Sequence, residues 1–100
     1  MPLFRLSTLA KNDLKKIAIF TEHQWGTEQR NHYLLQFDQC FHQLSENPSL
    51  GNACDYIRTG YRKHPQGSHL IFYRMGSGDT IEIIRILHKS MDISSKFQKA

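Results

Sequence analysis

The sequence predicts an α+β fold, in which an N-terminal strand is followed by a helical hairpin packed on one face of a mostly antiparallel four-stranded sheet. Residues 7–46 carry apolar side chains at helical spacing, and residues 56–88 form three extended segments separated by tight turns. The two helices are joined by only about two residues, which makes them antiparallel. With 39% hydrophobic residues, residues 1–100 are expected to form a single domain.

The first helix follows a short strand over residues 3–6, and the Ser7 hydroxyl is placed to cap its N-terminus. One stripe of this helix is predicted to face the core. It contains Ala10, Leu14, Ile17, Ala18, Thr21 and Trp25.

The second helix is predicted over residues 28–45. Gly26 can adopt the left-handed conformation that ends the first helix, and Thr27 can cap the second. Pro48 ends it, because the residue before a proline is driven out of the helical region.

The strands are predicted at residues 56–63, 68–74 and 80–88. The middle one is apolar on both faces and should be central, whereas residues 56–63 alternate and should form an edge. The tail, residues 91–100, is expected to form one or two docked turns that include Phe97. The predicted core contains Leu14, Ile17, Leu34, Phe37, Phe41, Ile71, Tyr73, Ile83 and some of Ile81, Ile84 and Ile86.

Composition excludes collagen-like, coiled-coil and fully disordered chains. No segment has the roughly 18 consecutive apolar residues of a membrane span, and the N-terminus lacks a signal-peptide pattern, so a soluble, cytoplasmic protein is expected. Cys40 and Cys54 are too few for a disulfide framework and are expected to be reduced and partly buried. The six histidines have no metal-ligand spacing, so neither a metal nor another cofactor is expected.

The net charge of +4 is confined to the second half of the chain. Residues 51–100 carry eight basic and four acidic side chains, whereas residues 1–50 carry five of each. On the predicted edge strand Arg58 and Arg62 lie on the same side, where two guanidinium groups can bind phosphate or carboxylate. The alternative is a solvated edge on which these arginines pair with Asp55, Asp79 or Glu82.

Several short motifs, in this order and spacing, resemble the ParE toxins of the RelE/ParE superfamily over nearly the entire chain. They are Arg5-Leu-Ser, Asp13-Leu, Ile17, Thr21, Trp25-Gly26, Gln29, Tyr33, Pro48, Leu50-Gly51, Ile57-Arg58-Thr-Gly-Tyr61-Arg62, Ser68-His-Leu-Ile-Phe-Tyr73, Ile84-Arg-Ile-Leu-His88 and Met91-Asp92.

This resemblance implies the toxin of a type II toxin–antitoxin system. Such a toxin is neutralised by a ParD-like antitoxin, contacts operator DNA only through that antitoxin, and inhibits DNA gyrase. RelE-type relatives instead cleave messenger RNA on the ribosome. Arg62, Arg85 and His88 could supply part of a nuclease site, but no tyrosine follows Tyr73, so a toxin without enzymatic activity is favoured over an endoribonuclease. A plain nucleic-acid binder and an inactive toxin remain alternatives.

Two sets of contact residues are predicted. The antitoxin is expected to place acidic residues against Arg58, Arg62 or Arg74, beside Tyr61 and Tyr73, and apolar residues along the hairpin and sheet edge. The predicted gyrase contacts are Trp25, His88, Lys89, Met91, Asp92, Lys96 and Phe97. For Trp25, its place on the apolar stripe favours a role in the core.

Overall fold

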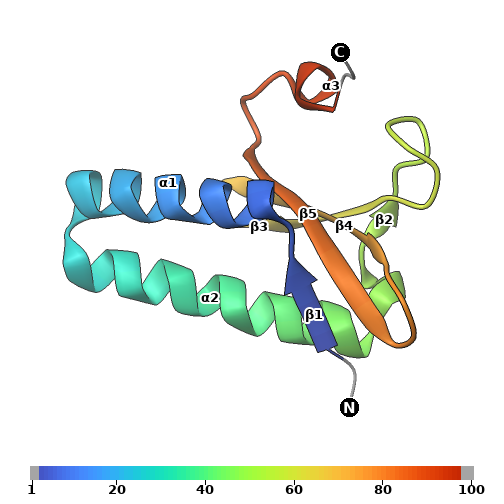
Figure 1. The fold of residues 1–100 in the computed structure, drawn as a ribbon. Coiled ribbons are helices and arrows are strands. Elements are labelled where there is room, and N and C mark those ends of the chain that lie inside the picture. The colour runs from blue at the N-terminus through green and yellow to red at the C-terminus, as the bar shows by residue number, and fades with distance from the viewer. Residues whose placement is uncertain (1–2, 98–100) are drawn as a thin grey trace.

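A five-stranded sheet carries two antiparallel helices on one face in the computed structural model, which describes residues 3–97 (Figure 1). In chain order the elements are β1 (Leu3–Leu6), α1 (Thr8–Trp25), α2 (Thr27–Glu46), the 3₁₀ turn η1 (Pro48–Leu50), β2 (Asn52–Ala53), β3 (Arg62–Gln66), β4 (His69–Met75), β5 (Thr80–His88) and α3 (Ile93–Lys96). The strand order is β1-β5-β4-β3-β2. β1 runs parallel to β5 and the other pairs are antiparallel, which confirms the predicted α+β class with β2 as an additional strand.

The helix ends explain why the hairpin turns so sharply. The Ser7 side chain accepts a hydrogen bond from the Ala10 N–H at 3.0 Å, as predicted for the cap of α1. Gly26, with a φ of 93°, is both the C-cap of α1 and the N-cap of α2. The predicted cap at Thr27 is therefore wrong, because that residue is already helical. The one-residue connection leaves the helices only an antiparallel course.

Both faces of the sheet are covered. Ile71 and Tyr73 of β4 pack with the helices, together with Phe37, Phe41 and Leu44 of α2. Phe72 of β4 points to the other face, where it joins Cys54 and Leu87 in a smaller cluster. The prediction that β4 is central and apolar on both faces is confirmed.

A β-bulge in β5 decides which isoleucines reach the hairpin. Phe72 pairs with Arg85 and Tyr73 with Ile83, so Ile84 has no partner of its own on β4. Because of this extra residue, Ile83 and Ile86 both belong to the hairpin-side cluster although they are three positions apart. Ile84 is left half-buried.

The predicted edge strand over residues 56–63 is wrong. The chain from Cys54 makes turns instead, because the Cys54 carbonyl accepts the Ile57 N–H at 2.9 Å and the Asp55 carboxylate accepts the Gly60 N–H at 2.8 Å. The ladder begins only at Arg62. Arg58 and Arg62 therefore do not share one face of a strand.

The tail docks on the outer face of the sheet, as the sequence predicted. The ring of Phe97 lies 5.0 Å from that of Phe72 and 5.8 Å from that of Tyr61, measured between centroids. The Arg58 side chain donates to the Phe97 carbonyl at 3.1 Å. Residues 98–100 of the predicted tail lie outside the described residues.

Beyond the end of β1, Ser7 and Asp13 make further hydrogen bonds to β5. The Ser7 N–H donates to the Ile83 carbonyl and its hydroxyl to the Ile84 carbonyl, at 3.0 and 2.7 Å. The Asp13 carboxylate then accepts the Ile86 N–H at 3.0 Å and two hydrogen bonds from the Arg85 guanidinium, at 2.8 and 2.9 Å. The hydrogen bonds that Arg85 donates to Asp13 raise the pKa of Arg85 against the opposing effect of burial.

We expect Asp13→Ala to lower the free energy of unfolding by about 3–5 kcal/mol, because it leaves the buried Arg85 charge without its partner. Glu22→Ala is the control, since it breaks an ion pair of similar length, 2.7 Å, between side chains that are 47% and 29% exposed. That loss should stay below about 1 kcal/mol. Urea denaturation measures both, and equal losses would contradict a special role for Asp13.

Candidate functional site

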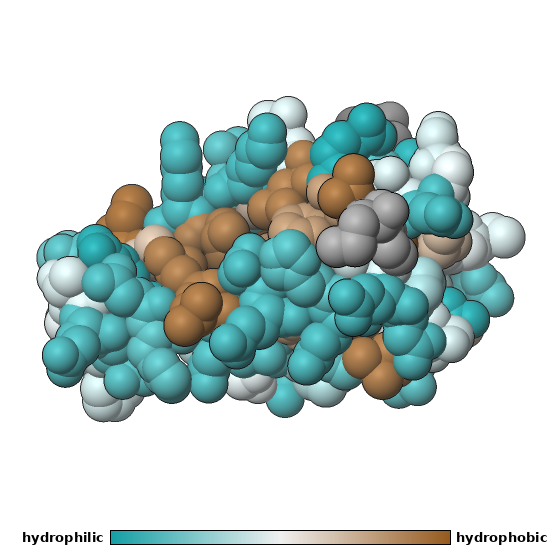
Figure 2. Space-filling view, turned by 90° about the horizontal axis from the view of Figure 1, so that it is seen from below, coloured by the Kyte–Doolittle hydropathy of each residue, from teal (hydrophilic) through white to brown (hydrophobic). Residues whose placement is uncertain are grey.

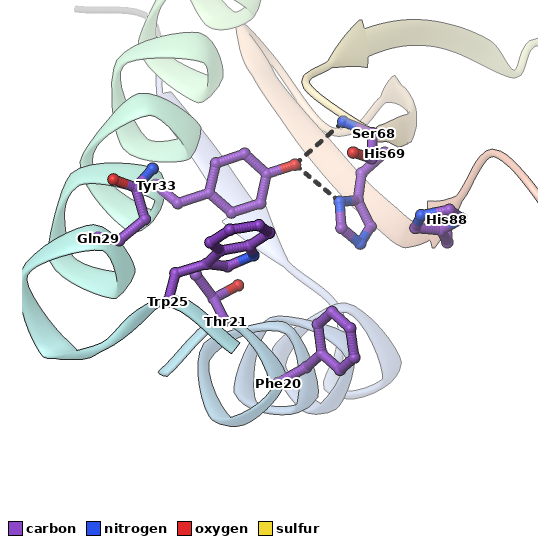
Figure 3. A pocket seen from close by; sticks show the side chains of 8 residues that line it. All are labelled: Phe20, Thr21, Trp25, Gln29, Tyr33, Ser68, His69 and His88. Carbon is purple, nitrogen blue, oxygen red and sulfur yellow. Dashed lines mark hydrogen bonds between the residues drawn. The ribbon is translucent and has the colours of Figure 1, made fainter. Parts of the chain in front are cut away.

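A cleft of about 490 Å³ opens where the hairpin meets the ends of β4 and β5 (Figure 3). Its walls are Phe20, Thr21, Trp25, Gln29, Tyr33, Ser68, His69 and His88. A second cavity of about 380 Å³ shares Phe20, His69 and His88 with it and adds Asp13, Lys16, Ile17, Ile86, Ser90 and Met91. Because they share three lining residues, the two cavities adjoin each other, and together they are here called the aromatic groove.

Tyr33 joins α2 to the turn between β3 and β4 and so fixes one wall of the groove. Its hydroxyl accepts the Ser68 N–H at 3.2 Å and lies 2.8 Å from His69 Nδ1. A Cβ on Gly67, whose φ is +58°, would come within 2.5 Å of that hydroxyl, so a glycine is required there. Burial raises the pKa of Tyr33, which remains a neutral hydrogen-bonding group.

His69 and His88 face each other across neighbouring strands. They are register partners, and their rings meet edge to face at 5.2 Å between centroids. Burial, with a smaller effect of His88, lowers the pKa of His69 from 6.5 to about 4, although Asp13 acts in the opposite direction. His69 is therefore neutral at pH 7.

Large apolar side chains are exposed beside this groove. Trp25 is 71% exposed, Phe20 62% and Met91 43%. The prediction that Trp25 belongs to the core is wrong, because Trp25 lies at the Gly26 end of the hairpin, which extends beyond the sheet (Figure 1). Figure 2 shows hydrophobic residues gathered in a band on one face of the molecule, between hydrophilic margins.

A third cavity, of about 340 Å³, brings together residues predicted for two different partners. Arg58 and Tyr61, predicted for the antitoxin, line it beside Lys96 and Phe97, predicted for gyrase. We call this cavity the basic pocket, and Leu9, Ile84 and Arg85 complete its lining. Of the other predicted gyrase contacts, His88 and Met91 lie in the aromatic groove, and Lys89 and Asp92 are exposed.

The remaining predicted antitoxin contacts are engaged within the fold. The Arg62 side chain donates to the Gly51 carbonyl at 2.7 Å. Arg74 pairs with Glu82 at 2.9 Å. Tyr73 is only 1% exposed and its hydroxyl donates to the Pro48 carbonyl, so its prediction as a contact residue is corrected: it has no surface to offer a partner.

Comparison with known proteins agrees with the order of these elements. A profile described as "ParE toxin of type II toxin-antitoxin system, parDE" matches residues 4–93. The protein named "Toxin ParE1" from Mycobacterium tuberculosis is 40% identical over 90 residues, which cover 90% of this chain and 92% of that protein. "Toxin ParE1" from Caulobacter vibrioides is 40% identical over 92 residues, covering 92% and 94%. This chain belongs to the ParE toxin family.

A solved structure has the same fold. A chain of the "Chromosomal ParDE TA system from P. aeruginosa" superposes with a TM-score of 0.73 at 20% identity, covering 88% of this chain and 95% of that one. The resemblance stated from the sequence motifs is thereby confirmed for both family and fold.

The basic residues that could serve a nuclease do not meet in this ParE chain. In the register of the sheet, Arg62 lies opposite Tyr73 and His88 lies opposite His69. Because Tyr73 and His69 are four positions apart on β4, Arg62 and His88 are separated by roughly 13 Å along the strands. Arg85 is held by Asp13. Within residues 3–97 no three His, Cys, Asp or Glu side chains lie together as metal ligands, and no helix there is long and apolar enough to cross a bilayer.

Sequence reasoning missed the central group of the groove, Tyr33 with His69. Tyr33 lies four residues before the core residue Phe37, which signals that it faces inward, but nothing local indicates that the turn before His69 lies beneath it. Asp13 was noted only as part of a motif. Its partner is 72 residues away in the chain, at Arg85.

Stability of this ParE chain should fall as the pH drops from about 6.5 to 4. The folded protein keeps His69 neutral while the unfolded chain takes up the proton first, so acid favours unfolding, by about 3 kcal/mol in full. Urea denaturation across this range should give a flatter profile for His69→Gln. His32→Gln, which changes an exposed histidine, is the control, and the same flattening in it would refute the assignment to His69.

Proposed function

We propose that this protein inhibits DNA gyrase and is neutralised by a ParD-like antitoxin. Membership of the ParE toxin family carries the proposal. Inhibition of this kind needs a surface that binds one state of the target enzyme better than another, and no proton transfer. The exposed aromatic residues beside the groove and the tail provide candidate surfaces, with Trp25, His88 and Met91 on one side and Lys96 and Phe97 on the other.

The separation of the basic residues supports a role without catalysis. Cleavage of RNA requires a base, an acid and cations around one phosphate. Arg62 and Arg85 each make a hydrogen bond inside the fold, and His88 lies well away from Arg62 along the sheet.

One observation favours the alternative, a RelE-type endoribonuclease. Tyr33, His69 and His88 form a group whose imidazoles could exchange protons with a bound substrate. Lys16 is the one lysine or arginine among the described residues that lines the same groove, and a phosphorane calls for more than one cation, so we rank the alternative second.

We expect the purified protein to block supercoiling of plasmid by gyrase and ATP, or to accumulate linear cleaved DNA. Trp25→Ala should weaken the inhibition about tenfold, a typical loss for a large exposed contact residue. Leu35→Ala is the control, because Leu35 is 53% exposed and lies outside the groove. Absence of any effect on gyrase, together with cleavage of ribosome-bound messenger RNA, would reverse the assignment.

The antitoxin is proposed to contact both sites of the toxin. The solved relative comes from a ParDE system, and this chain has a basic pocket suited to acidic side chains beside apolar surface on the hairpin. In this proposal the toxin contacts operator DNA only through the antitoxin, in the cytoplasm.

Lys96→Glu should weaken the complex with the antitoxin several-fold, and the loss should shrink at high salt, because the contact is electrostatic and partly exposed. Lys15→Glu is the matched control, an exposed lysine on α1 outside every cavity described above. Isothermal titration calorimetry at two salt concentrations measures both. Equal weakening by the two variants would show that only net charge matters.

A further inference from the structure

We propose that the aromatic groove binds one unpaired base of a single-stranded nucleic acid. This goes beyond the proposed inhibition of gyrase and does not depend on it, because the groove is formed by this chain alone. The inference rests on three features of the groove: its rings, its hydrogen-bonding groups and its charge.

The rings come from four elements that only the fold brings together. Phe20 and Trp25 belong to α1, Tyr33 to α2, and His69 and His88 to β4 and β5. Figure 3 shows the Tyr33 side chain reaching from α2 to His69, with Trp25 and Phe20 of α1 below it. A base offers two flat faces to such rings, and stacking on aromatic side chains is how proteins hold unpaired bases. The cleft, about 490 Å³, has the volume of a small-molecule site.

The apolar part of the groove is open to solvent. Phe20 is 62% exposed and Trp25 is 71% exposed, although both are large. Side chains of this size that remain exposed around a depression mark a binding site more often than a packing defect.

The polar groups of the groove match the edge of a base. The Tyr33 hydroxyl has two acceptors within reach, His69 Nδ1 at 2.8 Å and the Gln66 carbonyl at 3.2 Å. Nε2 of the neutral His69 is therefore a donor when the hydroxyl proton is directed at Nδ1 and an acceptor when it is directed at Gln66, and in either form it offers one hydrogen-bonding group to the edge of a base. The Gln29 amide on α2 supplies both a donor and an acceptor at the same cleft.

The charge of the groove suits a phosphate. Among the described residues, Asp13 and Lys16 are its charged side chains, apart from the histidines, and Asp13 is paired with Arg85. Lys16 is exposed and lies where the second cavity continues the cleft, so it can meet the backbone of a strand whose base is inserted. The several acidic residues of an antitoxin segment are matched better by the basic pocket, which has three cationic side chains.

Trp25, the single tryptophan of the chain, reports directly on occupancy of the groove. Its fluorescence, excited at the red edge of its absorption, is followed while oligothymidylate of about fifteen residues is added to the purified protein. We expect saturable quenching. A strand of equal length made of abasic residues carries the same phosphates without bases and should quench several-fold more weakly. A matching duplex should also quench weakly, and thymidine monophosphate tests whether a free nucleotide suffices.

Two pairs of variants assign the binding to the groove. Phe20→Ala should weaken the apparent affinity for the oligothymidylate at least about fivefold through lost stacking. Ile19→Ala should leave it unchanged, because Ile19 is 61% exposed, as Phe20 is, but lies outside the groove. Lys16→Glu should weaken binding and reduce its salt dependence, whereas Lys15→Glu should change both less.

Equal quenching by the abasic strand would overturn the proposal, because binding would then be electrostatic only. Equal effects of Phe20→Ala and Ile19→Ala would overturn it as well, as would no quenching by the oligothymidylate. Saturation by thymidine monophosphate at the same concentration as the oligothymidylate would identify a free nucleotide as the ligand and overturn the assignment to a strand. None of these outcomes bears on gyrase, which is absent from the mixture.

Discussion

The Asp13 carboxylate is the contact on which the arrangement of hairpin and sheet depends. β1 pairs with β5 only as far as Leu6, and beyond that point β5 would be an open edge. Asp13 closes this edge by accepting the Ile86 N–H together with the Arg85 guanidinium. A charge pair in this position is costly to bury and more costly to break, so it fixes how α1 lies along β5.

The same pair separates the two candidate sites. Asp13 lines the aromatic groove and Arg85 lines the basic pocket, so the ion pair forms part of the wall between them. With its charge satisfied by Asp13, Arg85 adds less to the basic pocket than Arg58 and Lys96 do. The groove in turn is left with little negative charge. A ParE toxin built in this way can present an aromatic surface and a basic surface side by side without either one compromising the other.

Two tyrosine hydroxyls each hold a glycine-containing segment in place, Tyr33 from α2 and Tyr73 from β4. The Tyr33 hydroxyl holds the turn at Gly67, and the Tyr73 hydroxyl holds Gly51 by accepting its N–H at 2.8 Å. At both glycines a Cβ would come within 2.5 Å of the hydroxyl. The Tyr33 side chain forms a wall of the aromatic groove, whereas the Tyr73 side chain fills the core and offers no surface to a partner. The two tyrosines thus serve different purposes, because they lie in different elements and have different surroundings.

The sequence alone determined the α+β class, the hairpin and its sharp joint at Gly26, the central strand with two apolar faces and the resemblance to ParE, because these depend on local periodicity, caps and short motifs. Tertiary structure decided the rest. The bulge at Ile84 places Ile86 on the side of the sheet that faces the hairpin. Hydrogen bonds accepted by the Cys54 carbonyl and the Asp55 carboxylate fold the predicted strand over residues 56–63 into turns. It also left Trp25 exposed and placed Tyr33 against His69. These outcomes depend on register and on the length of the hairpin relative to the sheet, which are set by contacts between residues far apart in the chain.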